Sequence, residues 1–337
     1  MSDSPDVSVV MSVYNDAQYL RDSIESILRQ EGVKLEFIII DDGSTDESGS
    51  ILDEYATKDA RLRVVHQQNQ GLTLALISGC SMARGRYIAR QDSDDISLSN
   101  RLRKLASVLD DNQDAALVAS SSGMIGPKGE FLFNKYADTA PADPENDTYC
   151  HGSLMFRRES YEHIGGYRSE FRAAQDVDLQ FRLAEVGAVH FVPDLLYVYR
   201  IEESSISARS PVQRQLARFA EQARDARRSG MSESHILADA ATAASHRSSS
   251  IRSEPGTGNY FIGRCLYAQR DRRALSYLWA CCKSNPASLR YWGAFAQAIV
   301  LSKSTKGFDV TLAGVVPNKS TGGPHDLPNV AVNSLTS

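Results

Sequence analysis

Residues 87–95 have the sequence YIARQDSDD, in which a run of β-favouring residues ends in three carboxylates, Asp92, Asp94 and Asp95. Like charges this close together at the end of a buried strand destabilise a fold unless a cation neutralises them. Carboxylate oxygens suit Mg²⁺ or Mn²⁺, which combine one or two carboxylates with substrate phosphates. The segment Asp92-Ser93-Asp94 therefore predicts a D-x-D site for a metal and a nucleotide. For the motif taken alone, the alternative is a solvated acidic turn that caps the next helix.

Three apolar, β-branched segments precede this stretch, at residues 7–13, 35–40 and 62–65, and helical patterns separate them. Such alternation predicts a parallel sheet with right-handed crossovers and helices on both faces. In these sheets ligands bind beyond the carboxyl ends of the strands. We therefore expect the polar residues that follow the first, second and fourth strands to meet at one edge. These residues are Ser12, Asp41, Asp42, Asp92 and Asp94.

Beyond the acidic stretch, the pattern predicts a hairpin around residues 127–129, a strand at 154–156, a helix from 174 to 187 and a strand at 190–199. Near residue 205 the composition changes to Arg, Ala, Ser and Gln, and helices are predicted at 211–229, 233–244, 258–283 (with a break near Asp271) and 287–302. We expect three parts: residues 1–204 as the main domain, 205–303 as a basic helical region, and 304–337 as a disordered tail.

Charge differs between the two ends of the chain. Residues 1–204 have a net charge of −14 and residues 205–337 a net charge of +9. The acidic part argues against nucleic acid as a partner. The basic 205–303 region suggests either peripheral contact with an anionic membrane surface or an ordinary solvated helix face. Within it, Tyr277, Trp279, Tyr291 and Trp292 are expected to form the core, with a membrane-interface belt as the alternative.

The five cysteines are scattered without metal-ligand spacing, which favours a reducing compartment. No basic segment followed by an apolar core marks the N-terminus, and no apolar run reaches the ~18 residues of a membrane span. We therefore expect a cytoplasmic protein, with the inner membrane face as the one candidate surface for peripheral attachment.

Six segments follow one another in a distinctive order and spacing: VSVVMSVYND, FIIIDDGSTDES, NQGL, YIARQDSDD, HGSLMFRRESYEHIGGYRSEF and AQDVDLQFRLAEVG. Together they resemble the family 2 glycosyltransferases over about residues 7–207. The resemblance implies the GT-A fold, an α/β, Rossmann-like and mainly parallel mixed sheet with helices on both faces, followed here by a C-terminal helical region. It also implies inverting transfer of a sugar from a nucleoside-diphosphate donor, with UDP-sugars favoured. The acceptor would be a hydroxyl of a glycan, a lipid-linked or another molecule, in surface polysaccharide or glycoconjugate synthesis.

The resemblance also implies a role for each matching residue. Ser12 and Tyr14 would line the nucleotide pocket, and Asp41 and Asp42 would contact the base or ribose. In the D-x-D segment, Asp92 and Ser93 would lie on the ribose side, and Asp94, with Asp92, would hold the divalent cation, Mn²⁺ or Mg²⁺. Asp176 would be the general base that takes the proton of the acceptor hydroxyl, and its place at a helix start favours the ionised carboxylate. A plain helix N-cap is the alternative for Asp176.

The chain departs from the family pattern at three positions. Gln175 replaces a common Glu, Ile77 replaces a common Asn, and Glu202 stands where a His near the metal is common. Glu202 is either a cation ligand or a solvent-exposed residue. His151 is either an acceptor contact or a buried structural histidine. Arg200 either reaches the diphosphate or pairs with a neighbouring glutamate.

Two other classes of protein remain as alternatives. A nucleotidyltransferase also combines a parallel sheet with an acidic metal pair, but it would usually have a Gly-rich phosphate loop after the first strand, where this chain has SVYNDAQY. A non-catalytic scaffold that binds sugar nucleotides would not need Asp92, Asp94 and Asp176 together.

Overall fold

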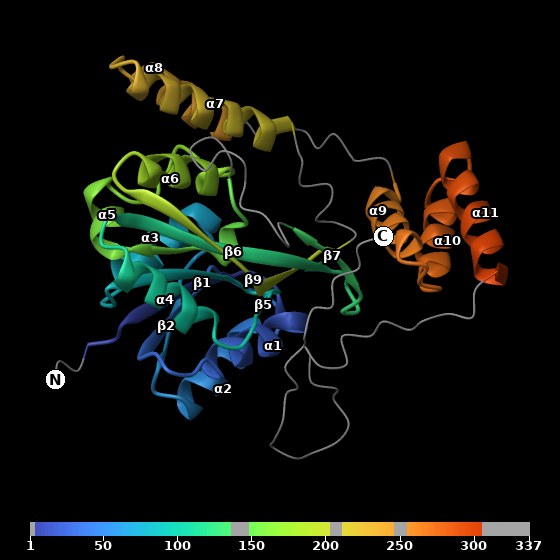
Figure 1. The fold of residues 1–337 in the computed structure, drawn as a ribbon, viewed down its shortest axis with the longest axis horizontal. Coiled ribbons are helices and arrows are strands. Elements are labelled where there is room, and N and C mark those ends of the chain that lie inside the picture. The colour runs from blue at the N-terminus through green and yellow to red at the C-terminus, as the bar shows by residue number, and fades with distance from the viewer. Residues whose placement is uncertain (1–3, 136–147, 203–210, 246–254, 305–337) are drawn as a thin grey trace. The chain divides into compact units, whose positions relative to one another are not determined.

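The computed structural model describes residues 4–135, 148–202, 211–245 and 255–304 (Figure 1). Its contacts divide the chain into two compact units. The first unit comprises residues 1–124, 134–200 and 207–253, and the second comprises residues 125–133, 201–206 and 254–337. The predicted tail at 304–337 lies almost entirely outside the described residues. The division at residue 204 stays a prediction, although packing groups the helical residues 211–245 with the first unit.

The first half of the sheet is parallel, as predicted. β1 (Val7–Val13), β2 (Leu35–Asp41), β3 (Leu62–His66) and β4 (Tyr87–Asp92) lie in the order β3-β2-β1-β4. Every residue of β1 and β2 is buried, because helices cover both faces of this part of the sheet. The parallel pairing aligns the carboxyl ends of these strands at one edge.

The second half of the sheet contains antiparallel pairs. The strand order continues from β4 through β8 (Met155–Arg157), β6 (Ala115–Ile125) and β9 (Ala188–Arg200) to β5 (Ile96–Ser97), and β7 (Phe131–Lys135) pairs with β6 off this path. β8 is antiparallel to both β4 and β6. The sheet is therefore mixed, and β9 pairs with β5 directly after the acidic stretch.

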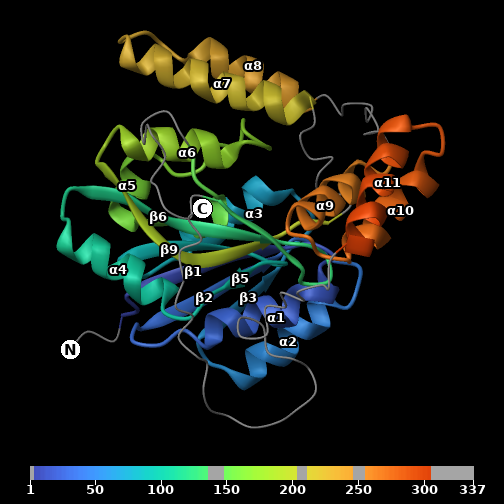
Figure 2. The ribbon, with the colours of Figure 1, turned by 45° about the vertical axis from the view of Figure 1, so that its right-hand side comes forward.

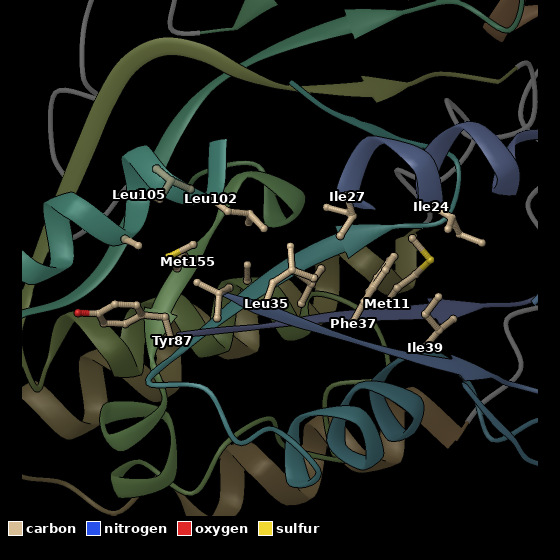
Figure 3. Packing of buried hydrophobic residues seen from close by; sticks show 14 of the residues in the cluster. Met11, Ile24, Ile27, Leu35, Phe37, Ile39, Tyr87, Leu102, Leu105 and Met155 are labelled. Atoms are coloured by element: carbon tan, nitrogen blue, oxygen red, sulfur yellow. The ribbon is translucent and has the colours of Figure 1, made fainter. Parts of the chain in front are cut away.

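Helices cover both faces of the sheet. Alternate residues of β1 and β2, such as Met11 and Phe37, pack against α1 (Ala17–Leu28), α2 (Ser48–Lys58) and α4 (Arg101–Asp111) (Figure 3). On the opposite face, Val10 and Ile88 lie in a cluster with residues of α3 (Leu72–Ser81), α5 (Arg158–His163) and α6 (Gln175–Ala184). The alternating burial follows from the two-residue period of a strand.

Two further helices pack on α6 within the first unit. α7 (Pro211–Arg228) and α8 (Ser234–Ser245) lie side by side along α6 (Figure 2). Leu216 and Ala220 of α7 contact the apolar cluster of Phe171 and Phe181. Glu233 accepts hydrogen bonds from Arg168 (2.6 Å) and from Arg227, and so connects this helical pair to the segment before α6.

The second unit contains α9 (Thr257–Ala268), α10 (Ala274–Ser284) and α11 (Leu289–Ser304) together with the hairpin at residues 126–130. The hairpin is confirmed by the bond from the Gly126 amide to the carbonyl of Glu130 (2.7 Å). The Tyr277 hydroxyl donates to Glu130 Oε1 (2.6 Å) and fixes the hairpin to α10. Within the described part of the chain, none of the helices has the length and hydropathy needed to span a bilayer.

Candidate functional site

Three residues singled out by the sequence are neighbours at the carboxyl edge of the sheet. On one side of β1, Ser12 is paired with Asp92 of β4. On the other side of β1, the next residue, Val13, is paired with Asp41 of β2. The parallel register therefore brings together Ser12, Asp41 and Asp92, as the alternation of strands and helices predicted. Tyr14 follows in the next turn and is exposed.

The turns after β1 and β2 are bonded to each other. Asn15 adopts a left-handed conformation (φ 59°), which Asn tolerates better than most residues. Its amide donates to Ser44 Oγ (3.1 Å), and its Oδ1 accepts a hydrogen bond from the Thr45 amide (2.7 Å). Asp46 Oδ2 accepts from the amide of Ala17 at the start of α1 (3.1 Å). The polar run DDGSTDES thus shapes the edge through backbone contacts.

Asp42 is buried and holds the NQGL turn. Its Oδ1 accepts hydrogen bonds from Gln67 Nε2 (2.7 Å) and the Gln70 amide (2.9 Å), and its Oδ2 accepts from the Gly71 amide (2.7 Å). A cavity of about 400 Å³ lies directly beside these amides, lined by residues 69–74 and Arg172. Asp42 therefore holds in place the turn that borders the cavity.

Asp41 is bonded to the same neighbourhood from β2. Its two oxygens accept from the Ser44 amide (3.0 Å) and contact His66 Nδ1 (2.7 Å). Burial works to raise the pKa of Asp41, but the hydrogen bonds from Ser44 and His66 prevail and hold this pKa below its usual value. Asp41 is thus kept ionised.

Negative charge is concentrated in the turn after β4. Burial, together with the carboxylates of Asp92 and Asp16, raises the pKa of Asp94 to about 7. Ser93 Oγ donates to Asp16 Oδ2 and joins this turn to the start of α1. Asp16 is a member of the cluster that the sequence interpretation missed; its place directly after VSVVMSVYN was the available signal.

Asp95, the third carboxylate of the stretch, has a different position from Asp94. It is buried, its Oδ2 accepts a hydrogen bond from the Tyr197 hydroxyl (2.7 Å), and its Oδ1 accepts one from the Arg200 amide (2.8 Å). Burial and the neighbouring Asp94 raise its pKa well above the usual value. Asp95 therefore anchors the acidic turn to β9.

Two buried arginines lie behind the acidic turn, and the sequence interpretation had not identified either of them. Arg90 Nη2 donates to Asp92 Oδ1 (2.5 Å), and Arg90 Nη1 donates to the Val10 carbonyl (3.3 Å). Arg101 Nη2 donates to the carbonyls of Arg90 (2.9 Å) and Gly152 (2.6 Å). A charged residue inside the apolar strand YIARQD was the signal for Arg90, because an unpaired buried cation is costly.

Asp176 lies in the first turn of α6, near these charges. Burial raises the pKa of its carboxyl group, hydrogen bonds from the amides of Asp176 and Val177 oppose this shift, and the Asp92 carboxylate adds to it. Asp176 and Asp92 thus lie within electrostatic reach of each other, although 84 positions separate them in the sequence. Ala174, in a left-handed conformation (φ 58°) and buried against Phe171, sets the start of the helix.

The remaining candidates have varied surroundings. His151 Nε2 contacts the Tyr167 hydroxyl (2.6 Å), and burial and Arg90 depress the pKa of His151, so that its ring stays neutral. Arg200 Nε donates to the backbone carbonyl of Asp94 (3.1 Å), and its guanidinium stacks on Tyr19 (4.2 Å). Glu202 belongs to the second unit. Gln175 is buried at the start of α6.

The acidic turn suits a divalent cation only with ligands from outside the protein. Among the described residues, no three His, Cys, Asp or Glu side chains form a group that could hold a metal ion. The chemistry of the donors nevertheless fits Mg²⁺ or Mn²⁺, since Asp92, Asp94 and Asp16 provide hard oxygens whose mutual repulsion a cation would relieve. Such cations take only one or two protein carboxylates when phosphate oxygens complete their shell.

Comparison with known proteins gives matches in sequence and in fold. Residues 8–165 match the model of the family described as glycosyl transferase family 2. Bacillus subtilis EpsE, described as a glycosyltransferase, is 33% identical over 225 residues, which cover 62% of this chain and 78% of EpsE. Escherichia coli chondroitin synthase is 28% identical over 195 residues, covering 57% of this chain and 28% of that protein. The chain also spans 63% of Bacillus subtilis EpsJ, with 31% identity.

Solved structures with a similar fold are more distant in sequence. Staphylococcus aureus TarS 1–349, in complex with UDP-GlcNAc, has a TM-score of 0.54 at 16% identity and covers 95% of this chain and 98% of TarS 1–349. The mannosyltransferase PcManGT of Pyrobaculum calidifontis, in complex with GDP-Man and Mn²⁺, has a TM-score of 0.53 at 18% identity, covering 90% of this chain and 81% of that chain. These likenesses show the fold.

Proposed function

The chain belongs to glycosyl transferase family 2 and is a glycosyltransferase with the GT-A fold, and from this premise we propose that it transfers a sugar from a nucleoside-diphosphate donor to an acceptor hydroxyl with inversion at the anomeric carbon. Family membership sets aside the nucleotidyltransferase and the non-catalytic scaffold. The proposal rests on one observation above all: Ser12, Asp41 and Asp92 are adjacent at one sheet edge, and Asp176 is within electrostatic reach of Asp92.

In this proposal the nucleoside occupies the edge formed by the turns after β1 and β2. Ser12 and Tyr14 line the pocket, and Asp41 and Asp42 contact the base or ribose. Support comes from the neighbouring turn at residues 69–71, which Asp42 holds and which borders a cavity of about 400 Å³. UDP in TarS and GDP-Man in PcManGT are bound by proteins of this fold, and we favour a UDP-sugar here.

The diphosphate is proposed to meet the acidic turn through a divalent cation. Asp94, with Asp92 and Ser93 beside it, would hold Mn²⁺ or Mg²⁺, which when bound stabilises the negative charge of the leaving diphosphate. Arg90 neutralises one oxygen of Asp92 (2.5 Å), which leaves Asp94 as the principal cation ligand. The Mn²⁺ in the PcManGT complex supports this assignment.

Asp176 is proposed as the general base. A sugar hydroxyl is a weak nucleophile near neutral pH, and a carboxylate that takes its proton accelerates attack on the anomeric carbon. The raised pKa of Asp176 suits this task, because a base is most effective when its pKa approaches the working pH. A single base opposite the leaving group gives direct displacement and inversion, as in inverting glycosidases.

The acceptor is proposed to be a hydroxyl of a glycan or of a lipid-linked intermediate in the synthesis of a surface polysaccharide or another glycoconjugate. Chondroitin synthase among the relatives supports a polymeric product. His151, whose Nε2 contacts the Tyr167 hydroxyl (2.6 Å), does not identify this acceptor by its chemistry, and the class of acceptor is therefore carried by the family alone.

The test combines donor binding with turnover. Thermal shifts with UDP-, GDP-, dTDP- and CMP-sugars, each with and without Mn²⁺, should show one donor that stabilises the protein mainly when the metal is present. Asp176→Asn should keep that stabilisation and lose transfer, whereas the control Glu162→Gln, an exposed carboxylate on α5, should keep both. Unchanged turnover of Asp176→Asn would refute the base assignment, and the absence of stabilisation by every donor would refute the donor class.

A further inference from the structure

α11 is apolar on two opposite faces. Tyr291, Ala294 and Ala298 are buried and face the rest of the second unit. Leu289, Trp292, Ala296 and Val300 follow the helical spacing i, i+3, i+7 and i+11 along the other side, and all four are exposed. A helix of a globular protein usually has one apolar face. Among the described residues, the second apolar face of α11 is therefore only partly covered by its own unit, through the contact of Trp292 with Trp279.

The exposed face continues onto α10 through aromatic contacts. The rings of Trp279 and Trp292 meet edge to face with centroids 5.9 Å apart, and Phe295 lies 5.4 Å from Trp279. We call the set Trp279, Leu289, Trp292, Phe295 and Val300 the tryptophan face. Trp279 is 43% exposed, Trp292 40%, Leu289 86% and Val300 70%. The expectation that both tryptophans form the core is thus wrong, while that for Tyr277 and Tyr291 is confirmed.

The segment that contains α9, α10 and α11 is strongly basic. Residues 255–304 contain seven Lys and Arg and a single acidic residue, Asp271, which is already paired with Arg273 (2.5 Å). Lys283 and Arg290, at the facing ends of α10 and α11, are exposed and flank the connection between the two tryptophans. Aromatic residues with an apolar body and a polar N–H, bordered by cations, are typical of protein surfaces that lie at the interface of an anionic bilayer.

We propose that the tryptophan face docks on the surface of an anionic lipid bilayer, with the indoles and Leu289 at the headgroup level and the surrounding Lys and Arg on acidic headgroups. Since α11 has 16 residues and no described helix could span a bilayer, the helix would lie in the plane of the interface. This narrows the surface expected for residues 205–303 to α10 and α11. It stands independently of the donor chemistry proposed for the first unit.

The chain provides its own reporter for this proposal. It contains only two tryptophans, so all tryptophan fluorescence of the full-length protein originates in the tryptophan face. We expect a blue shift of the emission and quenching by lipids brominated in the acyl chain when vesicles of phosphatidylcholine with about one third phosphatidylglycerol are added at low salt. Vesicles of phosphatidylcholine alone should bind much more weakly, and added salt should weaken binding to the anionic vesicles.

Two variants separate the apolar and the charged parts. Leu289→Ser combined with Val300→Ser removes two exposed apolar side chains and keeps both tryptophans as reporters. We expect this variant to bind the anionic vesicles at least about tenfold more weakly than the unmodified protein. Lys283→Gln combined with Arg290→Gln should also weaken binding about tenfold or more. Met231→Ser, which removes a residue that is 63% exposed in the first unit, is the matched control and should bind like the unmodified protein.

Two results would overturn the proposal. One is unchanged emission and no flotation with anionic vesicles at low salt. The other is a blue shift that appears with increasing protein concentration in the absence of vesicles, which would identify a second copy of the chain as the occupant of the tryptophan face. Donor-induced thermal stabilisation should be the same in all of these variants, so failure of the membrane proposal and failure of the proposed function remain distinguishable.

Discussion

The hydroxyl of Tyr197 donates a hydrogen bond to Oδ2 of Asp95 (2.7 Å) and accepts one from the backbone amide of Asp92 (3.1 Å). One side chain of β9 thus holds both ends of the acidic turn, across 102 positions of sequence. Gly152 lies against the same ring, since a Cβ at this position would be 2.0 Å from the hydroxyl. The acidic turn is therefore held in place by a fully buried side chain.

Tyr197→Phe should weaken both the fold and the donor site. The change removes a donor from the buried Asp95 and an acceptor from the Asp92 amide, at a cost of about 1–3 kcal/mol in the free energy of unfolding. We also expect a higher KM for the donor, because the turn loses its support. Tyr87→Phe is the control: it removes a hydroxyl bonded to Asp110 (2.7 Å), and should lower stability in urea titrations without affecting this KM. Equal KM values for the two variants would contradict the positioning role.

Asp94→Asn should stabilise the metal-free protein and abolish metal-dependent donor binding. Asp94 repels Asp92 and Asp16, so its neutralisation relieves electrostatic strain, and the unfolding midpoint should rise by about 2 °C or more. The additional stabilisation by donor and Mn²⁺ should disappear. Asp110→Asn, which breaks a pair with Arg86 (2.7 Å), should lower the midpoint and leave the donor effect intact. A metal-dependent donor shift in Asp94→Asn would exclude Asp94 as the principal ligand.

The rate of transfer should fall toward acid in a range set by Asp176. Burial and the nearby Asp92 raise the pKa of Asp176, so the base becomes protonated at a higher pH than an ordinary Asp near pH 4. The acid limb of kcat against pH is the measurement. Asp176→Glu, which keeps a carboxylate on a longer side chain, should retain some activity and a shifted acid limb. A limb at the ordinary Asp value would show that another group limits the rate.

Glu36→Gln should lower stability in a manner that depends on pH. Burial opposes ionisation of Glu36, but hydrogen bonds from Ser8 Oγ (2.6 Å) and the Arg84 amide (2.7 Å) lower its pKa below 4.5. The carboxylate therefore contributes stability above pH 4.5, and this contribution is lost as the pH falls through the lower folded pKa. The variant should lose about 1.5–3 kcal/mol at neutral pH and less in acid. Glu47→Gln, at an exposed position, should show neither effect.

Leu216→Ala tests whether α7 supports the base. Leu216 is fully buried in the cluster of Phe171, Ala174 and Phe181, which leads into Asp176. Its truncation should cost about 2–5 kcal/mol and lower kcat, because the start of α6 loses packing. Ile262→Ala, a fully buried change in the second unit, should cost a similar amount and leave kcat unchanged. A kcat that is reduced in Ile262→Ala and unchanged in Leu216→Ala would contradict this role of α7.

Much of the candidate site could be predicted because its signals are local. Strands buried on both faces must be continuously apolar, so VSVVMSV, LEFIII and YIARQD identify themselves, and polar turns that follow parallel strands must meet at one edge. This rule places Ser12 and Asp92 at the same edge, and the strand order β2-β1-β4 then makes them direct neighbours. The role proposed for Asp176 came from the resemblance to a known family, because no local pattern contains it.

Sequence by itself determined the strand–helix alternation, the α/β class and the edge at which Asp41 and Asp92 lie. Only the tertiary structure decided which groups hold them: Tyr197 on Asp95, Arg90 on Asp92, the NQGL turn on Asp42, and α7 behind α6. It also decided that Trp279 and Trp292 are exposed. The physical reason is that the spacing of apolar residues along a helix or strand shows which of its faces is apolar. The partner of a buried polar group, by contrast, comes from a segment that approaches it only when the chain folds.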